Sequence, residues 1–178
     1  MAQRVYPLSR VYALLEPGPV LLLATAGTAR PNVMTLSWHM PVEFEPPLVA
    51  CVLSNMDFSY ARLKAERECT LNIPTLELAD KVVAVGNCSG RDVDKFAAHG
   101  LATRPSSLVR APRVVGCYAS LECRVVDTRM ANRYGIFILE VVKAWVDASV
   151  KAPKTLHHRG KGTFMVAGDT ITLSSRMK

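Results

Sequence analysis

The pattern of hydrophobic positions predicts strands over most of the chain. Residues 20–25 and 48–53 are apolar almost throughout, which is typical of strands buried on both faces. Residues 116–128 and 134–146 alternate with a period near two, and the turn at 130–133 between them predicts a long hairpin. Further strands are expected at 33–40, 69–73, 163–167 and 170–173, the last two joined by a hairpin turn at Gly168-Asp169.

Shorter segments carry the helical period. They are expected at 8–15, before the break Pro17-Gly18-Pro19, from about Asp57 to 65, at 75–85, and at 93–98 with Asp92 near the helix N-terminus. About eight strands and a few short helices predict a mainly β fold with short helices, built as a β-barrel. Because no repeat or linker interrupts the chain, we expect a single domain over residues 1–178.

Composition narrows the class of protein. With 49% hydrophobic and 21% charged residues in 178, the chain is not intrinsically disordered and is long enough to bury a sizeable core. Five cysteines without a C-x-x-C spacing indicate neither a disulfide framework nor a zinc ribbon, and buried reduced thiols indicate a cytoplasmic protein. No apolar run is long enough to cross a bilayer, so no membrane partner is expected.

The net charge of +7 leaves several kinds of partner open. Nucleic acid, an acidic membrane, a phosphorylated ligand and a merely solvated surface are all compatible with it. Nucleic acid is disfavoured because the aromatic residues lie mostly within apolar strands and leave no stacking platform. A metal site is also disfavoured, since His157 and His158 are adjacent and point apart on an extended chain. The glycine patterns of Rossmann and P-loop nucleotide sites are absent.

Four segments in a fixed order indicate a family. They are Asn-Val-Met-Thr-Leu-Ser-Trp-His at 32–39 followed by Pro46-Pro47; Ser-Asn-Met-Asp-Phe-Ser at 54–59 leading to Leu-Asn-Ile-Pro at 71–74; residues 86–96 with Ser-Gly-Arg-Asp-Val-Asp-Lys-Phe; and Leu-Glu-Cys at 121–123 with His-His-Arg-Gly at 157–160. Together they cover about residues 20–178. This ordered set resembles the flavin reductase-like family of FMN-binding split β-barrels, near its flavoredoxin-type branch.

The resemblance implies bound FMN, with FAD as a possible alternative, and a set of contact residues. The expected cofactor-binding residues are Met34, Thr35, Leu36, Ser37, Trp38, Ser54, Asn55, Met56, Ser59, Asn72, Ser89, Lys95, His158 and Arg159. The physical chemistry agrees at several of them. Thr35 and Ser37 alternate along one strand, so both hydroxyls point to one face while Leu36 and Trp38 point to the other.

Some of these residues also have a purely structural interpretation. Ser59 lies near a helix N-terminus that can hold a phosphate, but Asp57 could cap that helix and leave Ser59 without a further role. Ser89, Asp94 and Lys95 are expected near the flavin, although Ser89-Gly90 could be only a turn and Lys95 only a solvated helix residue. His158 and Arg159 are expected near the cofactor or a subunit contact, since members of this family are homodimers.

One departure weakens the expectation of NAD(P)H. Many relatives that use it have Gly-Asp-His before the long penultimate strand, where this chain has Ala131-Asn132-Arg133-Tyr134. Arg133 could meet a phosphate or a protein electron donor, or be an exposed turn residue. The leading hypothesis is an FMN-binding oxidoreductase that passes reducing equivalents between a donor such as NAD(P)H and flavin or a downstream acceptor. It needs no catalytic side chain and no metal. The alternative is a non-enzymatic FMN-binding electron carrier or flavin storage protein.

Overall fold

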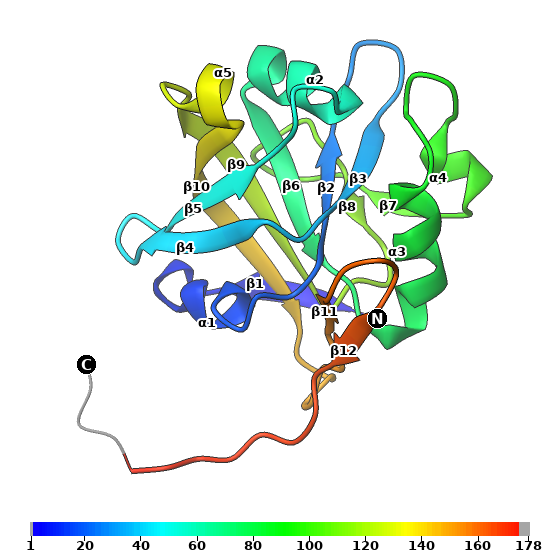
Figure 1. Ribbon diagram of the computed structural model, residues 1–178. Helices are drawn as coiled ribbons and strands as arrows, with labels where there is room; N and C mark the ends of the chain where they lie inside the picture. The colour runs from blue at the N-terminus through cyan, green and yellow to red at the C-terminus, as the bar shows by residue number, and fades with distance from the viewer. Residues whose placement is uncertain (1, 175–178) are drawn as a thin grey trace.

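The computed structural model describes residues 2–174 and is dominated by one curled antiparallel sheet (Figure 1). Seven strands follow the order β3-β2-β6-β9-β10-β5-β4, and β1 pairs with β10 beside them. The strands are β1 Gln3–Tyr6, β2 Leu21–Thr25, β3 Asn32–Leu36, β4 His39–Glu43, β5 Leu48–Val52, β6 Glu68–Ile73, β9 Ala119–Asp127 and β10 Ile136–Asp147. Two small pairs lie apart from it: β7 Thr103–Arg104 with β8 Arg113–Val114, and β11 Leu156–His158 with β12 Phe164–Val166.

Short helices connect and flank the strands of the sheet. They are α1 Tyr12–Leu15, α2 Phe58–Glu66, α3 Ala79–Gly86, α4 Lys95–Ala98 and α5 Ala131–Tyr134, with 3-10 turns at Leu8–Arg10 and Leu76–Leu78. The mainly β fold with short helices expected from the sequence is confirmed, and its antiparallel sheet curls into a half-barrel. No helix within residues 2–174 has the length and apolar character needed to span a membrane.

Strand β2 lies between two hydrophobic cores, and this position explains why its sequence is apolar throughout. Leu21 and Leu23 point into the curl of the sheet, where they pack in a cluster with Leu71, Leu121 and Phe137. The alternate residues of β2 point outward and pack under α3 and α4, in a second cluster made of Val20, Leu22, Ala24, Val82, Val85, Phe96 and others. A strand covered on both faces needs no polar side, and β2 is buried at every position.

The long hairpin predicted between residues 116 and 146 is confirmed as β9 and β10, which pair from Ala119 opposite Val146 to Asp127 opposite Ile138. The predicted turn contains α5, and Gly135 follows it in the left-handed region with a φ of 70°. A Cβ at Gly135 would lie 2.2 Å from the carbonyl oxygen of Leu53, so only glycine fits this close approach between the turn and the end of β5.

Two predicted strand boundaries are wrong. The strand expected at 33–40 is two strands: β3 pairs with β2, and β4 pairs with β5 on the far edge of the sheet. Residues 37 and 38 make the crossing between them. The hairpin expected around Gly168-Asp169 does not form either. β12 pairs instead with β11, where Leu156 is buried and its carbonyl accepts the Val20 N–H at 2.7 Å, whereas Ile171 is 76% exposed.

The helix boundaries also shift. The segment expected at 8–15 is a 3-10 turn followed by α1, and strand β1 before it was not predicted. The helix expected from residue 93 begins at Lys95. Asp94, rather than Asp92, is its N-cap, because the Asp94 carboxylate accepts the N–H groups of Phe96 and Ala97.

Candidate functional site

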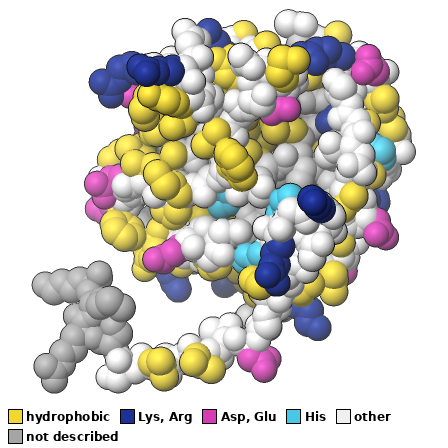
Figure 2. Space-filling view, in the orientation of Figure 1, with side chains coloured by type: hydrophobic (Ala, Val, Ile, Leu, Met, Phe, Trp, Pro, Cys, Tyr) yellow, Lys and Arg dark blue, Asp and Glu magenta, His cyan; other side chains and the backbone are white. Residues whose placement is uncertain are grey.

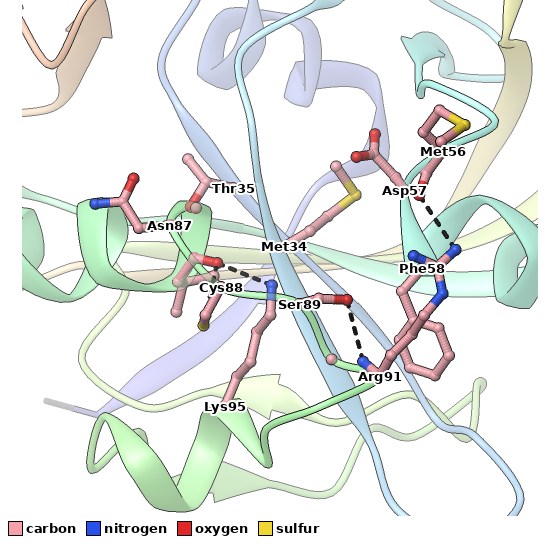
Figure 3. Close-up of a pocket in the computed structure, with 13 residues that line it drawn as sticks. Met34, Thr35, Met56, Asp57, Phe58, Asn87, Cys88, Ser89, Arg91 and Lys95 are labelled. Carbon is pink, nitrogen blue, oxygen red and sulfur yellow. Dashed lines mark hydrogen bonds between the residues drawn. The ribbon is translucent and has the colours of Figure 1, made fainter.

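The first cavity, of about 300 Å³, lies where β3, the loop before α2 and the loop between α3 and α4 come together (Figure 3). It is lined by Met34, Thr35, Met56, Asp57, Phe58, Val85, Gly86, Asn87, Cys88, Ser89, Gly90, Arg91 and Lys95. Three stretches that are far apart in the sequence therefore supply one site.

Close packing of Gly90 against the side chains of Asn32 and Phe58 fixes the loop between α3 and α4. A Cβ at Gly90 would lie 1.9 Å from Asn32 Oδ1 and 2.8 Å from a ring carbon of Phe58, so a larger residue does not fit. The same Asn32 donates from Nδ2 to the Ser59 hydroxyl at 2.8 Å, which ties β3 to the start of α2. Arg91 then donates to the carbonyl of Met56 at 3.2 Å and joins the two loops. The cavity walls are thus held to one another.

Lys95 is the buried cation of this cavity. Its side chain rises from α4 toward the cavity in Figure 3, it is only 6% exposed, and its Nζ donates to the Val85 carbonyl at 2.8 Å. Burial lowers the pKa of this ammonium, and the nearby Cys88 and Asp57 oppose that shift. An ammonium has three N–H donors, and within residues 2–174 only the Val85 carbonyl accepts one of them. The remaining donors are available to a ligand.

Other polar groups surround the same space. The Ser89 hydroxyl accepts the Arg91 N–H at 3.2 Å and keeps its own proton for donation. Arg91 is exposed, and its guanidinium carbon lies 5.7 Å from the centroid of the Phe58 ring. Asp57 is the one carboxylate of the lining, and its Oδ2 accepts the Ser54 N–H at 3.1 Å. The cavity therefore combines two cations and hydroxyl donors with the apolar side chains of two methionines and a phenylalanine.

A second cavity of about 270 Å³ adjoins the first, since Thr35, Gly86 and Asn87 line both. Its other lining residues are Val20, Ser37, Val82, Val83, His158, Gly162 and Phe164. The Thr35 hydroxyl donates to the carbonyl of Val82 at 2.6 Å and so holds α3 against β3. Thr35 on β3 and Ser37 just after β3 both line this cavity.

A third cavity of about 440 Å³ lies on the other side of the loop before α2. It is lined by Trp38, Val52, Leu53, Ser54, Asn55 and residues 131–135. Trp38 is 70% exposed here. Asn132 Oδ1 accepts from Lys64 Nζ at 2.7 Å, and the Arg133 guanidinium carbon lies 5.2 Å from the ring centroid of Tyr134. The stretch that replaces Gly-Asp-His is thus a cavity wall without a histidine.

The structure distributes the predicted site residues over these three cavities. The first cavity holds Met34, Thr35, Met56, Ser89 and Lys95; the second holds Thr35 again with Ser37 and His158; the third holds Trp38, Ser54 and Asn55. Four others line none of the three: Leu36, Ser59, Asn72 and Arg159. Leu36 belongs to the core inside the curl, and Arg159 is exposed at the β11–β12 turn.

Asn72 and Ser59 are polar but have partners inside the protein. Asn72 is fully buried, donates to the Leu22 carbonyl and to the Thr70 hydroxyl, both at 3.0 Å, and accepts the Val114 N–H. It therefore cross-links β2, β6 and β8. Ser59 is 2% exposed and accepts from Asn32. Asp57 stands at the N-cap position of α2 without a side-chain bond to the helix, so the capping alternative is not what the structure shows.

Sequence reasoning missed several residues of the first cavity. Arg91, Asn87 and Cys88 line it, and none was proposed as a contact. Arg91 stands inside the Ser-Gly-Arg-Asp stretch that contributed to the family resemblance, so a cation beside that turn was an available signal. The position of Cys88, whose Sγ lies 3.3 Å from His99 Nε2, had no sequence signal because the two residues meet only through the fold of α4.

Comparison with known proteins identifies the family. The model of the flavin reductase like domain matches residues 14–164. The chain is 34% identical over 173 residues to the uncharacterized protein YddH of Escherichia coli (strain K12), covering 89% of this chain and 92% of that protein. An uncharacterized protein of Archaeoglobus fulgidus is 30% identical over 142 residues, with 80% and 74% covered. The chain belongs to the flavin reductase-like family.

Solved structures agree with this assignment. The FMN-binding domain of a flavin reductases-like enzyme from Shewanella baltica OS155 superposes with a TM-score of 0.92 at 26% identity, covering 97% of this chain and 98% of that one. Flavoredoxin of Desulfovibrio vulgaris (Miyazaki F) superposes with a TM-score of 0.79 at 23% identity, covering 88% and 90%. The expected FMN-binding split-barrel fold is therefore confirmed.

Proposed function

We propose that the protein is an FMN-binding oxidoreductase that passes reducing equivalents between a donor such as NAD(P)H, or a protein donor, and flavin or a downstream acceptor. FAD is a possible second form of the cofactor. The observation that carries the proposal is Lys95, a buried cation that lines the first cavity with N–H donors left for a ligand. Burying a charge without full pairing costs free energy, and an anionic ligand offsets that cost.

The residues of the first cavity fit FMN in their chemistry. A flavin mononucleotide needs donors for a dianionic phosphate, polar groups for the edge of its ring and apolar contacts for the ring face. Arg91, Lys95 and Ser89 supply donors to an anion, and the side-chain amide of Asn87 can both donate and accept. Met34, Met56 and Phe58 supply apolar surface. Gly90 lets the loop backbone approach β3 closely enough to form the cradle.

The protein's own part is binding, orientation and exclusion of water. Bound flavin supplies the hydride and electron chemistry, so no side chain needs to act as nucleophile or general base. Lys95 places a positive charge at the cavity wall, which favours a more negative ligand over a less negative one. The apolar walls keep water from the ring face.

Flavin binding is tested by titrating FMN into the purified protein and following flavin fluorescence and visible absorption. Thr35→Ala together with Ser37→Ala should weaken FMN binding more than Lys151→Ala, since Lys151 is exposed in the turn after β10. Equal effects of the two changes would remove those hydroxyls from the site.

A second candidate function is an electron carrier or flavin storage protein without turnover. The observation that favours it is the wall of the third cavity, where Ala131–Tyr134 replaces the Gly-Asp-His of NAD(P)H-using relatives. Mixing the FMN-loaded protein with NADH or NADPH without oxygen separates the two functions. Prompt bleaching of the flavin supports the reductase, and an unchanged spectrum supports the carrier.

We also infer a homodimer. Met40 and Val42 on β4, the edge strand of the sheet, and Trp38 and Phe44 on either side of it are spaced two apart and are 45–70% exposed. Figure 2 shows hydrophobic side chains gathered on this left side of the molecule. An apolar stripe on an unpaired edge favours association. Met40→Lys with Phe44→Lys should convert a dimer to a monomer in sedimentation velocity, and Val126→Lys, at another exposed apolar residue, should not. A wild-type monomer would contradict the inference.

A cytoplasmic location is supported by the thiols. All five cysteines are free, and Cys69 and Cys123 face each other as partners on β6 and β9 without a disulfide. Such thiols persist in a reducing compartment. Fractionation of the source cell, with the protein found in the soluble interior, is the expected result.

A further inference from the structure

Cys88 differs from the other cysteines of the chain. Four of the five are at most 1% exposed: Cys51, Cys69, Cys117 and Cys123. Burial raises the pKa of the Cys51 and Cys117 thiols, which keeps both neutral and unreactive. Cys88 is only half-buried, and it lines the first cavity. It is therefore the thiol that a small reagent in this cavity can reach.

A histidine stands beside this sulfur. His99 directly follows α4, and its Nε2 lies 3.3 Å from Cys88 Sγ. The thiol can also donate to the carbonyls of Ala84 and Val85, which lie 3.4 and 3.9 Å from the sulfur, but a carbonyl does not remove the proton. An imidazole does, because it binds a proton in the neutral pH range. Cys88 and His99 thus pair a nucleophile with a base, which is the arrangement that activates a cysteine.

Lys95 brings a positive charge to the same sulfur. Its Nζ donates to the Val85 carbonyl, which Cys88 Sγ also contacts, so the ammonium and the sulfur are neighbours at the cavity wall (Figure 3). Burial lowers the pKa of Lys95, and the negative charge that Cys88 can carry opposes this shift. The oxidation of a cysteine is favoured by nearby cations, which stabilise the thiolate, and by exposure. Cys88 combines a base, a cation and access from the cavity.

The proposed flavin function leaves this pair without a role. Holding FMN needs cations, hydroxyls and apolar surface, and the hydride and electron chemistry of the flavin needs no nucleophile from the protein. Reduced flavin does react with dioxygen, however, and the products are oxidised flavin and hydrogen peroxide. A flavin cavity is therefore a place where a peroxide arises, and a reactive thiol in its wall meets that peroxide first.

We propose that Cys88 is a peroxide-sensitive switch in the wall of the first cavity. His99 takes the thiol proton, and the thiolate attacks a hydroperoxide, so that an S–O bond forms as the O–O bond breaks. The sulfur is oxidised to a sulfenic acid, and the leaving oxygen takes the proton from His99 and departs as water or an alcohol. The added oxygen accepts from the Lys95 ammonium and occupies donors that otherwise hold the flavin, a step that rests on the proposed function.

The oxidation is tested on flavin-free protein at neutral pH. Hydrogen peroxide is added together with dimedone, which traps sulfenic acids, and peptide mass spectrometry locates the label and its rate. Wild type should be labelled at Cys88. His99→Gln should react at least about tenfold more slowly, because the thiol loses its base. His157→Gln is the matched control, since its ring nitrogens contact Gly18 and Thr155, and it should react at the wild-type rate. No label, a label mainly at another cysteine, or an equal rate in His99→Gln overturns the proposal.

The effect on flavin is measured by titrating FMN into the oxidised protein after the excess peroxide is removed. FMN affinity should fall several-fold to about tenfold, the cost of one lost charge-assisted hydrogen bond. Dithiothreitol should restore it, because a first thiol forms a mixed disulfide and releases water and a second thiol frees Cys88. Cys88→Ser should have the same FMN affinity before and after peroxide.

Lys95→Met shows whether the oxidised sulfur acts through the lysine. Peroxide should change the FMN affinity of this variant by less than about twofold, because the donors that the added oxygen would occupy are already gone. Unchanged FMN affinity of wild type labelled at Cys88, or an equal fall in Lys95→Met, overturns the proposal. Absence of FMN binding before oxidation overturns the proposed flavin function instead, and the labelling of Cys88, which needs no flavin, still decides whether this thiol is the peroxide site.

Discussion

Glu122 and Lys95 are both buried charged side chains, but the fold surrounds them differently. The Glu122 carboxylate is fully buried and accepts the N–H groups of Ser107 and Leu108 and the indole N–H of Trp145, at 2.6–3.0 Å. Lys95 has one partner in the described chain, the carbonyl of Val85. A saturated charge stabilises the structure, whereas a charge with free donors is suited to bind a ligand.

The surroundings reinforce this contrast. Two cations lie near the Trp145 ring: the Arg113 guanidinium carbon is 4.0 Å and Lys143 Nζ is 4.7 Å from its centroid. Arg113 in turn donates to the Pro105 carbonyl. The loop from 104 to 112 is therefore held both by Arg113 and by the Glu122 carboxylate. Within residues 2–174 Lys95 has one hydrogen-bond partner, and its side chain lines a cavity. Although Leu-Glu-Cys at 121–123 contributed to the family resemblance, its glutamate is hydrogen-bonded within the protein and lines none of the three cavities.

The largest expected effect follows from breaking the Glu122 cluster. Glu122→Gln places an amide N–H2 against backbone N–H donors, so the free energy of unfolding should fall by about 3 kcal/mol. Urea denaturation followed by circular dichroism measures it. Glu140→Gln, at a half-buried glutamate of the neighbouring strand, should change stability by less than about 0.5 kcal/mol. FMN affinity of folded Glu122→Gln should equal that of wild type, and a strong loss of FMN would contradict the separation of the two regions.

Gly90→Ala should mainly damage the cavity. The new methyl group would lie 1.9 Å from Asn32 Oδ1, so the loop with Ser89 and Arg91 must move. We expect FMN affinity to fall at least about tenfold, which is the cost of misplacing one or two charge-assisted hydrogen bonds. Fluorescence titration gives the value. Gly168→Ala is the control, because a Cβ there meets nothing within 4 Å. Wild-type FMN affinity in Gly90→Ala would mean that this loop does not hold the flavin.

Lys95→Met tests whether the buried Lys95 ammonium serves ligand binding rather than stability, in contrast to the Glu122 carboxylate. We expect FMN affinity to fall several-fold to tenfold while stability at pH 7 stays equal or rises, because the buried charge is removed. The pKa of Lys95 is lowered from 10.5 by burial, so in the alkaline range below 10.5 the folded chain binds fewer protons than the unfolded chain. Any stability advantage of the variant should therefore shrink as pH rises through the folded pKa. Thermal denaturation between pH 7 and 10 measures it, and a strongly destabilised variant would make Lys95 a structural residue.

The smallest effect concerns salt. If Arg91 and Lys95 attract a phosphate, added NaCl should weaken FMN binding by a few-fold while riboflavin, which has no phosphate, changes less. Parallel titrations at low and high NaCl measure the difference. Equal salt dependence of the two flavins would place the phosphate away from these cations.

The hydrophobic pattern predicted much of the fold, because strand pairing between sequence neighbours and burial on both faces leave a clear pattern in the sequence. The β9–β10 hairpin is local in sequence, and β2 is apolar because both of its faces are covered. The break at 37–38 had no signal, since Met34, Leu36, Trp38 and Met40 keep one alternation through it. The false hairpin at Gly168-Asp169 shows the reverse error. Although Gly168-Asp169 is a favourable turn sequence, β12 pairs with β11 instead, and Leu156 of β11 is buried.

The site was harder to predict than the fold. Family resemblance brought five predicted residues to one cavity, but type and position alone could not show that Asn72 and Ser59 are bonded within the protein. Whether a polar side chain faces a ligand or a neighbouring strand depends on partners that are distant in sequence. The partner of Ser59 is Asn32, and the partners of Asn72 that are distant in sequence are Leu22 and Val114.

The central claim is that the first cavity holds FMN through its cations and hydroxyls. Equilibrium dialysis of the purified protein against FMN, with bound flavin measured by visible absorption, tests it most directly. We predict saturable uptake of one FMN per chain in the wild type, with clearly weaker uptake in Lys95→Met. A colourless protein that takes up no FMN, or uptake that is the same in both proteins, would contradict the claim.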